Sequence, residues 1–346
     1  MHTLSAAEAI SPAIERTKTF LFSQFRWGTF LKLCLVAVLT EGFGSFNFHS
    51  SGSGDQSSSS SPANLGFHPT PEIIAVIAAA VALAIVLSFV IAYLITRLRF
   101  AYFHCLIHNS TEIGPGWRLY GAQAARYFWM NVVVGICFLV LLAIVALPFV
   151  AGFMRLYKDQ QAGGQLDVGL LLSLLLPLIP IFLLFLLVCF AAEIILHDLM
   201  LPHYALDNAT AGQAFNAAWE RIVKAKGSFF FYALLRIVLP IAAMILIFIV
   251  MLIPAIVFIG ATAGIEYVLH SAYEGATGGA AAFGIFLQIV VGIVAFAIAF
   301  LVSLCIGGPL STGVREYALV FYGGRYQALG DILAAPPPAD PSLSAP

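Results

Sequence analysis

Long apolar runs alternate with shorter polar stretches along most of the sequence. A helix of about 20 residues, rising 1.5 Å per residue, crosses the roughly 30 Å hydrocarbon core of a bilayer. We expect six such membrane-spanning helices, over residues 25–44, 72–96, 128–152, 168–196, 228–262 and 283–306. Lipid offers the backbone no hydrogen-bond partners, so separate spans of this kind are helical. The pattern therefore predicts an all-α polytopic membrane protein with a single membrane domain over residues 1–330.

Two shorter segments place apolar residues at helical spacing among polar ones. Within residues 5–24, one face carries Ile10, Ile14, Thr17 and Leu21. Between the fourth and fifth spans, another face carries Phe215, Trp219, Ile222 and Val223. Both segments are expected to be helices that lie in the membrane interface. Trp219 is expected to anchor its helix there, and Pro202 to stop the helix before it.

The placement of these elements indicates an internal repeat. Each unit has an interfacial helix, an outward span, an outer loop and an inward span. The outward spans begin near residues 25, 128 and 228, a spacing of about 100 residues. We therefore expect three parallel hairpin repeats. Gly260 and Gly264 form a small-xxx-small pair that would allow two helices to approach closely.

Two segments have the composition of unstructured chain. Residues 45–70 are rich in Ser and Gly and almost uncharged, which predicts a flexible outer loop. The Pro-rich tail over residues 331–346 is expected to be disordered. The last span is expected to break or kink at Gly307–Pro309.

Composition agrees with a membrane protein. Hydrophobic residues make up 61% of the 346 residues and charged residues 10%, against about 25% charged residues in a typical soluble chain. The formal net charge of −1 gives no general attraction to nucleic acid. The five cysteines form no CxxC pair, so we expect no disulfide framework.

Basic residues set the expected orientation. All Lys and Arg except Arg155 and Lys158 fall beside one set of span ends, which the positive-inside rule assigns to the cytoplasm. Both termini are then cytoplasmic. The expected partners are membrane lipids, including anionic lipids of the inner leaflet near the cations Arg16, Lys18, Arg26, Arg221, Lys224 and Lys226.

The candidate polar site lies at the cytoplasmic ends of the later spans and comprises Glu193, His197, Asp198, Arg236 and Arg315. A carboxylate such as Asp198 is costly near hydrocarbon unless a cation accompanies it, and we expect its partner to be Arg236 or Arg315. This pair would either pin two hairpins together or form an anion or proton site. Glu41, at the end of the first span, is expected to face outer water.

A metal site is a weaker interpretation of the same region. Imidazole and carboxylate groups suit Zn²⁺ or Mn²⁺, and the candidate ligands are His104, His108, Glu193, His197 and His203. Such spacings also arise where a polar helix end meets water. We therefore predict no metal, no cofactor and no catalytic residues.

One segment resembles a known family. Asp198 and Pro202 in DLMLP, followed by Ala214, Trp219 and a basic-aromatic entry to an apolar span, give a D-x-x-x-P…A-W pattern. This pattern is similar to bacterial membrane proteins of unknown function related to the membrane domain of membrane-anchored glycerophosphodiester phosphodiesterases. The resemblance implies a membrane domain in a bacterial inner membrane. It does not imply hydrolysis, because no stretch here is long enough for those enzymes' soluble catalytic barrel.

Sparse charge within the spans favours a non-enzymatic protein that organises the membrane or acts as a scaffold. The alternative is a transporter or lipid-handling protein with a cytoplasm-facing polar site. Prolines and glycines within the spans favour this alternative, because interrupted helices often mark substrate sites.

Overall fold

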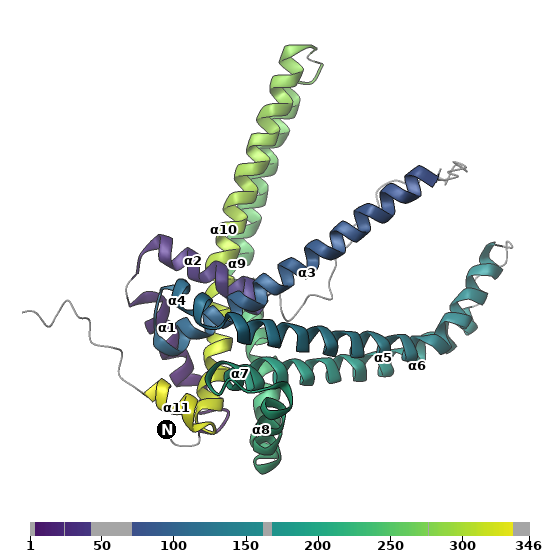
Figure 1. The fold of residues 1–346 in the computed structure, drawn as a ribbon. Helices are drawn as coiled ribbons and strands as arrows, with labels where there is room; N and C mark the ends of the chain where they lie inside the picture. Colours follow the sequence, from purple (N-terminus) through teal and green to yellow (C-terminus); the bar gives the residue numbers. More distant parts are fainter. Residues whose placement is uncertain (1–3, 24, 43–70, 162–167, 276, 335–346) are drawn as a thin grey trace, which may run out of the picture. The chain divides into compact units, whose positions relative to one another are not determined.

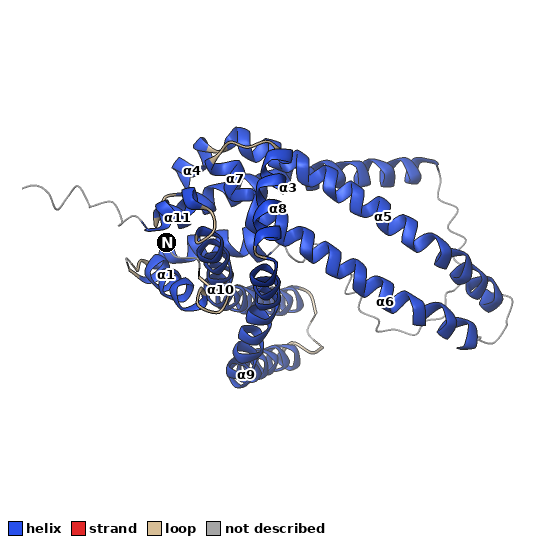
Figure 2. Cartoon of the chain, turned by 90° about the horizontal axis from the view of Figure 1, so that it is seen from below, coloured by secondary structure: helices blue, strands red, loops and turns tan. Residues whose placement is uncertain are grey.

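The computed structural model describes residues 4–23, 25–42, 71–161, 168–275 and 277–334. Every regular element in these ranges is a helix, as Figures 1 and 2 show, so the all-α prediction is confirmed for them. The helices form two compact units. Unit 1 comprises Met1–Gly44, Cys105–Thr111 and Lys224–Pro346, and unit 2 comprises Ser45–His104 and Glu112–Val223.

Unit 1 is built around two long helices, α9 (Lys226–Ala272) and α10 (Gly279–Gly323), which lie side by side as an antiparallel hairpin (Figure 1). Most of the buried residues of α10 lie in the part of the helix nearest the C-terminus. The elements that contact α10 there are α1 (Ile10–Phe22), α2 (Trp27–Ala37), the π-helical turn η1 (Val38–Gly42) and α11 (Gln327–Ala334).

Unit 2 contains a second helical hairpin, in which α5 (Gly121–Gln161) contacts α6 (Val168–Glu193). A π-helical turn, η2 (Ile194–Met200), joins α6 to α7 (Leu201–Leu206), which also contacts α5. The remaining elements are α3 (Pro71–His108), whose last turn belongs to unit 1, α4 (Ile113–Leu119) and α8 (Ala211–Lys224).

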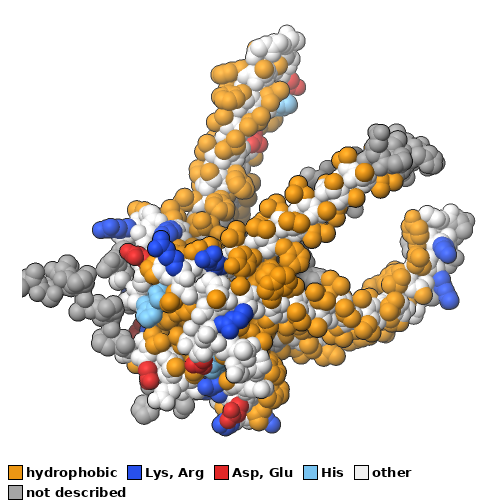
Figure 3. Space-filling model, viewed as in Figure 1, with side chains coloured by type: hydrophobic (Ala, Val, Ile, Leu, Met, Phe, Trp, Pro, Cys, Tyr) orange, Lys and Arg blue, Asp and Glu red, His pale blue; other side chains and the backbone are white. Residues whose placement is uncertain are grey.

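In the described part of the chain, five helical stretches are long and apolar enough to cross a membrane: Ile73–His108, Gly121–Lys158, Leu171–Leu206, Lys226–Ala272 and Gly279–Gly323. In four of them the most apolar 18-residue window is 0% buried, so these side chains need lipid or another protein around them. Figure 3 shows hydrophobic side chains covering the α9–α10 hairpin. These stretches indicate that the chain is a multi-pass membrane protein.

The predicted first span falls on α2, with 11 residues, and η1, with five. Together they are shorter than the roughly 20 residues that a spanning helix needs. The sixth span and the three-hairpin repeat stay predictions. The predicted outer loop, residues 45–70, lies outside the described residues. Residues 335–346 of the predicted disordered tail also lie outside the described residues. Residues 331–334 belong to α11, which ends at Ala334, so they are helical.

Prolines interrupt the long helices less than the sequence suggests. Of the predicted break or kink at Gly307–Pro309, the break is wrong, because α10 continues through Pro309 to Gly323; a kink there stays a prediction. Pro202 does not stop a helix, because α7 begins at Leu201 and continues past it. It occupies the first turn of α7, where a missing backbone N–H costs little. The chain reaches that position through η2, and the helical path ends only at Leu206.

Asn109 and Asn208 terminate helices in the left-handed conformation. Their φ angles are 49° and 52°, and no other described non-glycine residue has a positive φ. After Asn109, the N–H of Ser110 donates to the carbonyl of Cys105 at 2.9 Å. This is the closing bond of a Schellman cap, whose left-handed position suits Gly or Asn.

The left-handed cap makes a prediction for Asn109. Asn109→Ala is expected to lower the free energy of unfolding by roughly 1 to 2 kcal/mol, because a Cβ-bearing residue with no polar side chain is strained at this φ. Asn109→Gly is expected to match or exceed the parent. Thermal unfolding in detergent measures both. The control is Asn216→Ala, an exposed asparagine within α8; a loss there equal to that of Asn109→Ala would contradict the strain argument.

Glycines mark where the helices approach closely. A Cβ atom built on Gly308 of α10 would lie 2.3 Å from the Cβ of Cys34 in α2. Built Cβ atoms on Gly260 and Gly264 meet nothing within 4 Å among the described residues. The predicted close approach at Gly260 and Gly264 is therefore not seen within the described chain. Gly308 supplies the contact between α2 and α10.

Candidate functional site

A buried carboxylate of α10 anchors the N-terminal helix of unit 1. Glu316 is 1% exposed, and its Oε2 accepts a hydrogen bond from Arg16 Nε at 2.9 Å. The other two guanidinium nitrogens of Arg16 donate to the carbonyls of Leu333 at 3.3 Å and Leu106 at 3.2 Å. Arg16 thus joins α1 to three segments that are distant in sequence. Hydrogen bonds between charged groups are stronger than neutral ones, so these contacts orient the half-buried Arg16 side chain.

The neighbouring residue of α10 faces a second carboxylate. Arg315 is 1% exposed, and its Nε lies 3.9 Å from Glu41 Oε1, whose side chain is 5% exposed. Glu41 belongs to η1, so this contact joins the first apolar run to α10. The prediction that Glu41 faces outer water is wrong, because the residue is buried against α10. Burying either charge is costly, and the opposite charge of its partner offsets part of that cost.

An aromatic stack continues along the same part of α10. The ring of Tyr232 in α9 lies 4.3 Å from that of Phe321 at an interplanar angle of 8°, and 5.3 Å from that of Tyr317. The Arg325 guanidinium lies 3.9 Å from the centroid of the Phe321 ring. Burial lowers the pKa of Arg325, which nevertheless stays protonated at neutral pH. The cation–π contact offsets part of its lost hydration.

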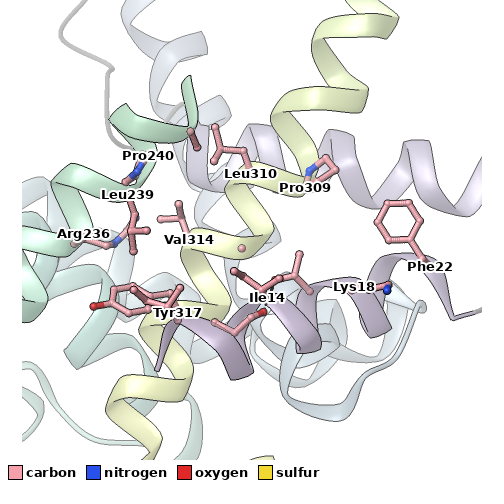
Figure 4. A pocket seen from close by; sticks show the side chains of 15 residues that line it. Ile14, Lys18, Phe22, Arg236, Leu239, Pro240, Pro309, Leu310, Val314 and Tyr317 are labelled. Carbon is pink, nitrogen blue, oxygen red and sulfur yellow. Dashed lines mark hydrogen bonds between the residues drawn. The ribbon is translucent and has the colours of Figure 1, made fainter. Parts of the chain in front are cut away.

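A cavity of about 370 Å³ opens beside these contacts, between α1, α9 and α10 (Figure 4). Most of its lining is apolar, including Ile14, Leu239, Pro240 and Leu310. Two cations also line it. Lys18 comes from α1 and Arg236 from α9. Of the predicted site residues, Arg236 therefore borders a cavity, whereas Arg315 lies in the ion pair with Glu41.

The other predicted site residues belong to unit 2. Asp198 and His197 lie in η2 and are 1% and 5% exposed, with His197 Nδ1 and Asp198 Oδ1 3.8 Å apart. Glu193 is the last residue of α6 and is half-buried. Because Asp198 is buried, a negative charge on it would need compensation. Its pairing with Arg236 or Arg315 would join residues of different units and stays a prediction.

Asp198 lies in a π-helical turn whose backbone bonds to a side chain. The hydroxyl of the buried Tyr127, in α5, donates to the carbonyl of Leu196 at 3.0 Å. A π turn shifts backbone bonding away from the α pattern, and such turns are frequent at functional sites. The bond from Tyr127 fixes the turn against α5.

Sequence reasoning missed a hydrogen-bonded histidine cluster in unit 2, formed by His203, Asp207 and Arg221. The Nδ1 of buried His203 lies 2.7 Å from Asp207 Oδ2, and Arg221 Nη1 lies 3.1 Å from His203 Nε2. An arginine can only donate, so Nε2 accepts and Nδ1 carries the proton that bonds Asp207. The i, i+4 spacing of His203 and Asp207 was a visible signal. Arg221 comes from α8, and no local spacing indicates its contribution.

The candidate metal ligands do not assemble. The described residues include all five histidines and carboxylates considered for a metal site. Among these described residues, no group of three or more His, Cys, Asp or Glu side chains is placed to hold a metal ion. His203 instead bonds Asp207 and Arg221.

Comparison with known protein families now bears on this arrangement. One family matches residues 4–332, which is nearly the whole chain. The chain belongs to a family of unknown function (DUF7544). Neither curated proteins nor solved structures gave a match. The DUF7544 match spans both units, so the ion pairs, the cavity and the histidine cluster all lie within the matched residues.

Helix α8 of this DUF7544 member presents its large apolar side chains outward. Phe215 and Trp219 are 44% and 50% exposed, and their rings stack 6.0 Å apart at 11°. The small residues Ala214 and Ala218 are fully buried. An outward apolar face on a short helix fits the predicted interfacial anchor better than a soluble surface. In this DUF7544 chain the described polar contacts orient helices, and the cavity of unit 1 offers space for a ligand.

Proposed function

We propose that this DUF7544 protein is a non-enzymatic integral membrane protein that organises the lipid or protein around it. One observation carries the proposal. The apolar windows of four spanning stretches are 0% buried, while Glu316 and Arg315 of α10 pair with Arg16 of α1 and Glu41 of η1. Here the spans offer their surface outward, to lipid or to a partner.

The buried ion pairs support a structural role for the charges. Pairs such as Arg16–Glu316 fix how helices meet, which is the best-attested use of buried charge. We further propose a bacterial inner membrane location with both termini cytoplasmic, on the distribution of Lys and Arg. The relation to the membrane domain of glycerophosphodiester phosphodiesterases, proposed from Asp198, Pro202 and Trp219, belongs to the same hypothesis.

Reconstitution of the full chain into vesicles of phosphatidylglycerol and phosphatidylcholine tests the proposal. Spin-labelled lipids are expected to show a motionally restricted population that grows with protein content, because exposed apolar spans immobilise neighbouring lipid. Internal pH dyes are expected to show proton flux no faster than in protein-free vesicles. A flux that rises with protein content would instead support the transporter alternative. Absence of restricted lipid would remove the membrane-organising proposal.

A further inference from the structure

The cavity of unit 1 combines an apolar wall with cationic residues. Its volume of about 370 Å³ falls in the range of small-molecule sites, roughly 300–1,000 Å³. The apolar wall comes from all three helices and includes Ala243 in α9 and Val314 in α10. Figure 4 shows Arg236 and Lys18 on opposite sides of this wall. The lining contains no Asp or Glu.

The setting of the cavity limits what can occupy it. α9 and α10 are long apolar helices suited to a membrane, so the ligand must be soluble in lipid. α1 is the predicted interfacial helix, and its residues Ile14 and Phe22 are 61% and 48% exposed where they line the cavity. The ligand therefore meets both an apolar wall and the region where headgroups lie. An acyl chain with a polar headgroup has this division.

Charge selects among lipids. Lys18 is exposed on α1, whereas Arg16, two residues earlier, is held by Glu316. Lysine near an anionic lipid surface contributes about 1 kcal/mol of attraction. The lining has two cations and no acid, so it favours the anionic phosphate of a lipid and disfavours a ligand that carries a net positive charge.

We propose that this cavity binds one anionic diacyl phospholipid from the surrounding bilayer. One acyl chain lies against Ile14, Leu239, Pro240 and Leu310, and the phosphate lies at Lys18. Arg236, on the other side of the wall, adds positive potential. This site goes beyond a general organising role, because it holds a defined lipid and would do so whether or not the protein restricts the bilayer around it.

Native mass spectrometry of the purified full chain tests the proposal. The chain is incubated in detergent with equal amounts of phosphatidylglycerol and phosphatidylcholine that carry the same acyl chains. We expect one phosphatidylglycerol per chain, favoured over phosphatidylcholine by about five-fold, the ratio that about 1 kcal/mol gives. Lys18→Met is expected to reduce this preference to nearly none. The control Lys158→Met removes an exposed cation of α5 outside the cavity and is expected to keep it.

A second variant tests the apolar wall. Ala243→Phe fills the cavity from α9 and is expected to abolish retention of both lipids. Equal retention of the two lipids by the parent chain would overturn the proposal. So would an equal loss of preference in the Lys18→Met and Lys158→Met variants, or retention by Ala243→Phe as strong as by the parent. Because Lys18 is exposed, the Lys18→Met result stands even where Ala243→Phe fails to fold.

Discussion

Replacing Arg315 with leucine is expected to lower the free energy of unfolding by about 3 to 5 kcal/mol, the range found when one partner of a buried ion pair is removed. Arg315 and Glu41 are almost fully buried and lie 3.9 Å apart. The substitution removes the cation that the Glu41 carboxylate faces, and little water reaches that carboxylate. The contact between η1 and α10 should loosen first, because these two residues belong to those elements.

Equilibrium unfolding in mixed micelles with increasing dodecyl sulfate measures this loss. Replacing both residues, in Glu41→Leu with Arg315→Leu, is expected to recover much of it, since the pair then becomes apolar. Arg155→Leu is the control, because Arg155 is exposed on α5 and surface changes cost within about 0.5 kcal/mol. If Arg315→Leu unfolds like Arg155→Leu, the pair does not hold η1 to α10.

Gly308→Ala is expected to cost about 1 to 3 kcal/mol, the usual range for overpacking. The added Cβ would lie 2.3 Å from Cys34 Cβ and 2.6 Å from Cys34 Cα. The second of these atoms is backbone, so rotation of a side chain cannot relieve the clash. Helix α2 must therefore move away from α10, which also strains the nearby contact of η1 with α10.

Gly264→Ala supplies the matched comparison for that experiment. It is the same chemical change inside a long apolar helix, and a Cβ there meets no described atom within 4 Å. Alanine in a helix interior is favoured over glycine by roughly 0.5 to 1 kcal/mol, so this variant is expected to be neutral or more stable. Equal destabilisation by Gly308→Ala and Gly264→Ala would contradict the close approach of α2 to α10.

The long helices could be predicted from the sequence, because runs without acids or bases leave few alternatives to a membrane helix. Their lengths could not. α10 passes through Pro309, where a break or kink was expected, and it contacts α1 and α2, which no pattern within α10 itself reveals. The same limit applies to Pro202, which lies in the first turn of α7, directly after the π-helical turn η2.

The candidate site shows why partners are harder to predict than burial. The cost of a charge near hydrocarbon marked Asp198 and Arg315 as residues that need compensation, and both are buried. The contact of Arg315 with Glu41 depends on which elements meet, and the two residues are far apart in the sequence. The hydrophobic pattern of a single helix also does not show where a cavity forms, because a cavity depends on which helices meet. Lys18 and Arg236 come from two helices, α1 and α9, that are far apart in the sequence.

The length of α9 has a consequence for where the protein can reside. Between Arg236 and Glu266, α9 contains no charged residue, and at 1.5 Å per residue this stretch is about 45 Å long. A typical hydrocarbon core is roughly 30 Å thick, and tilts of spanning helices range over roughly 0–40°. Tilting within that range does not fully absorb the difference. The hairpin therefore favours thick bilayers, and it would draw the protein toward the thickest regions of a membrane that varies in thickness.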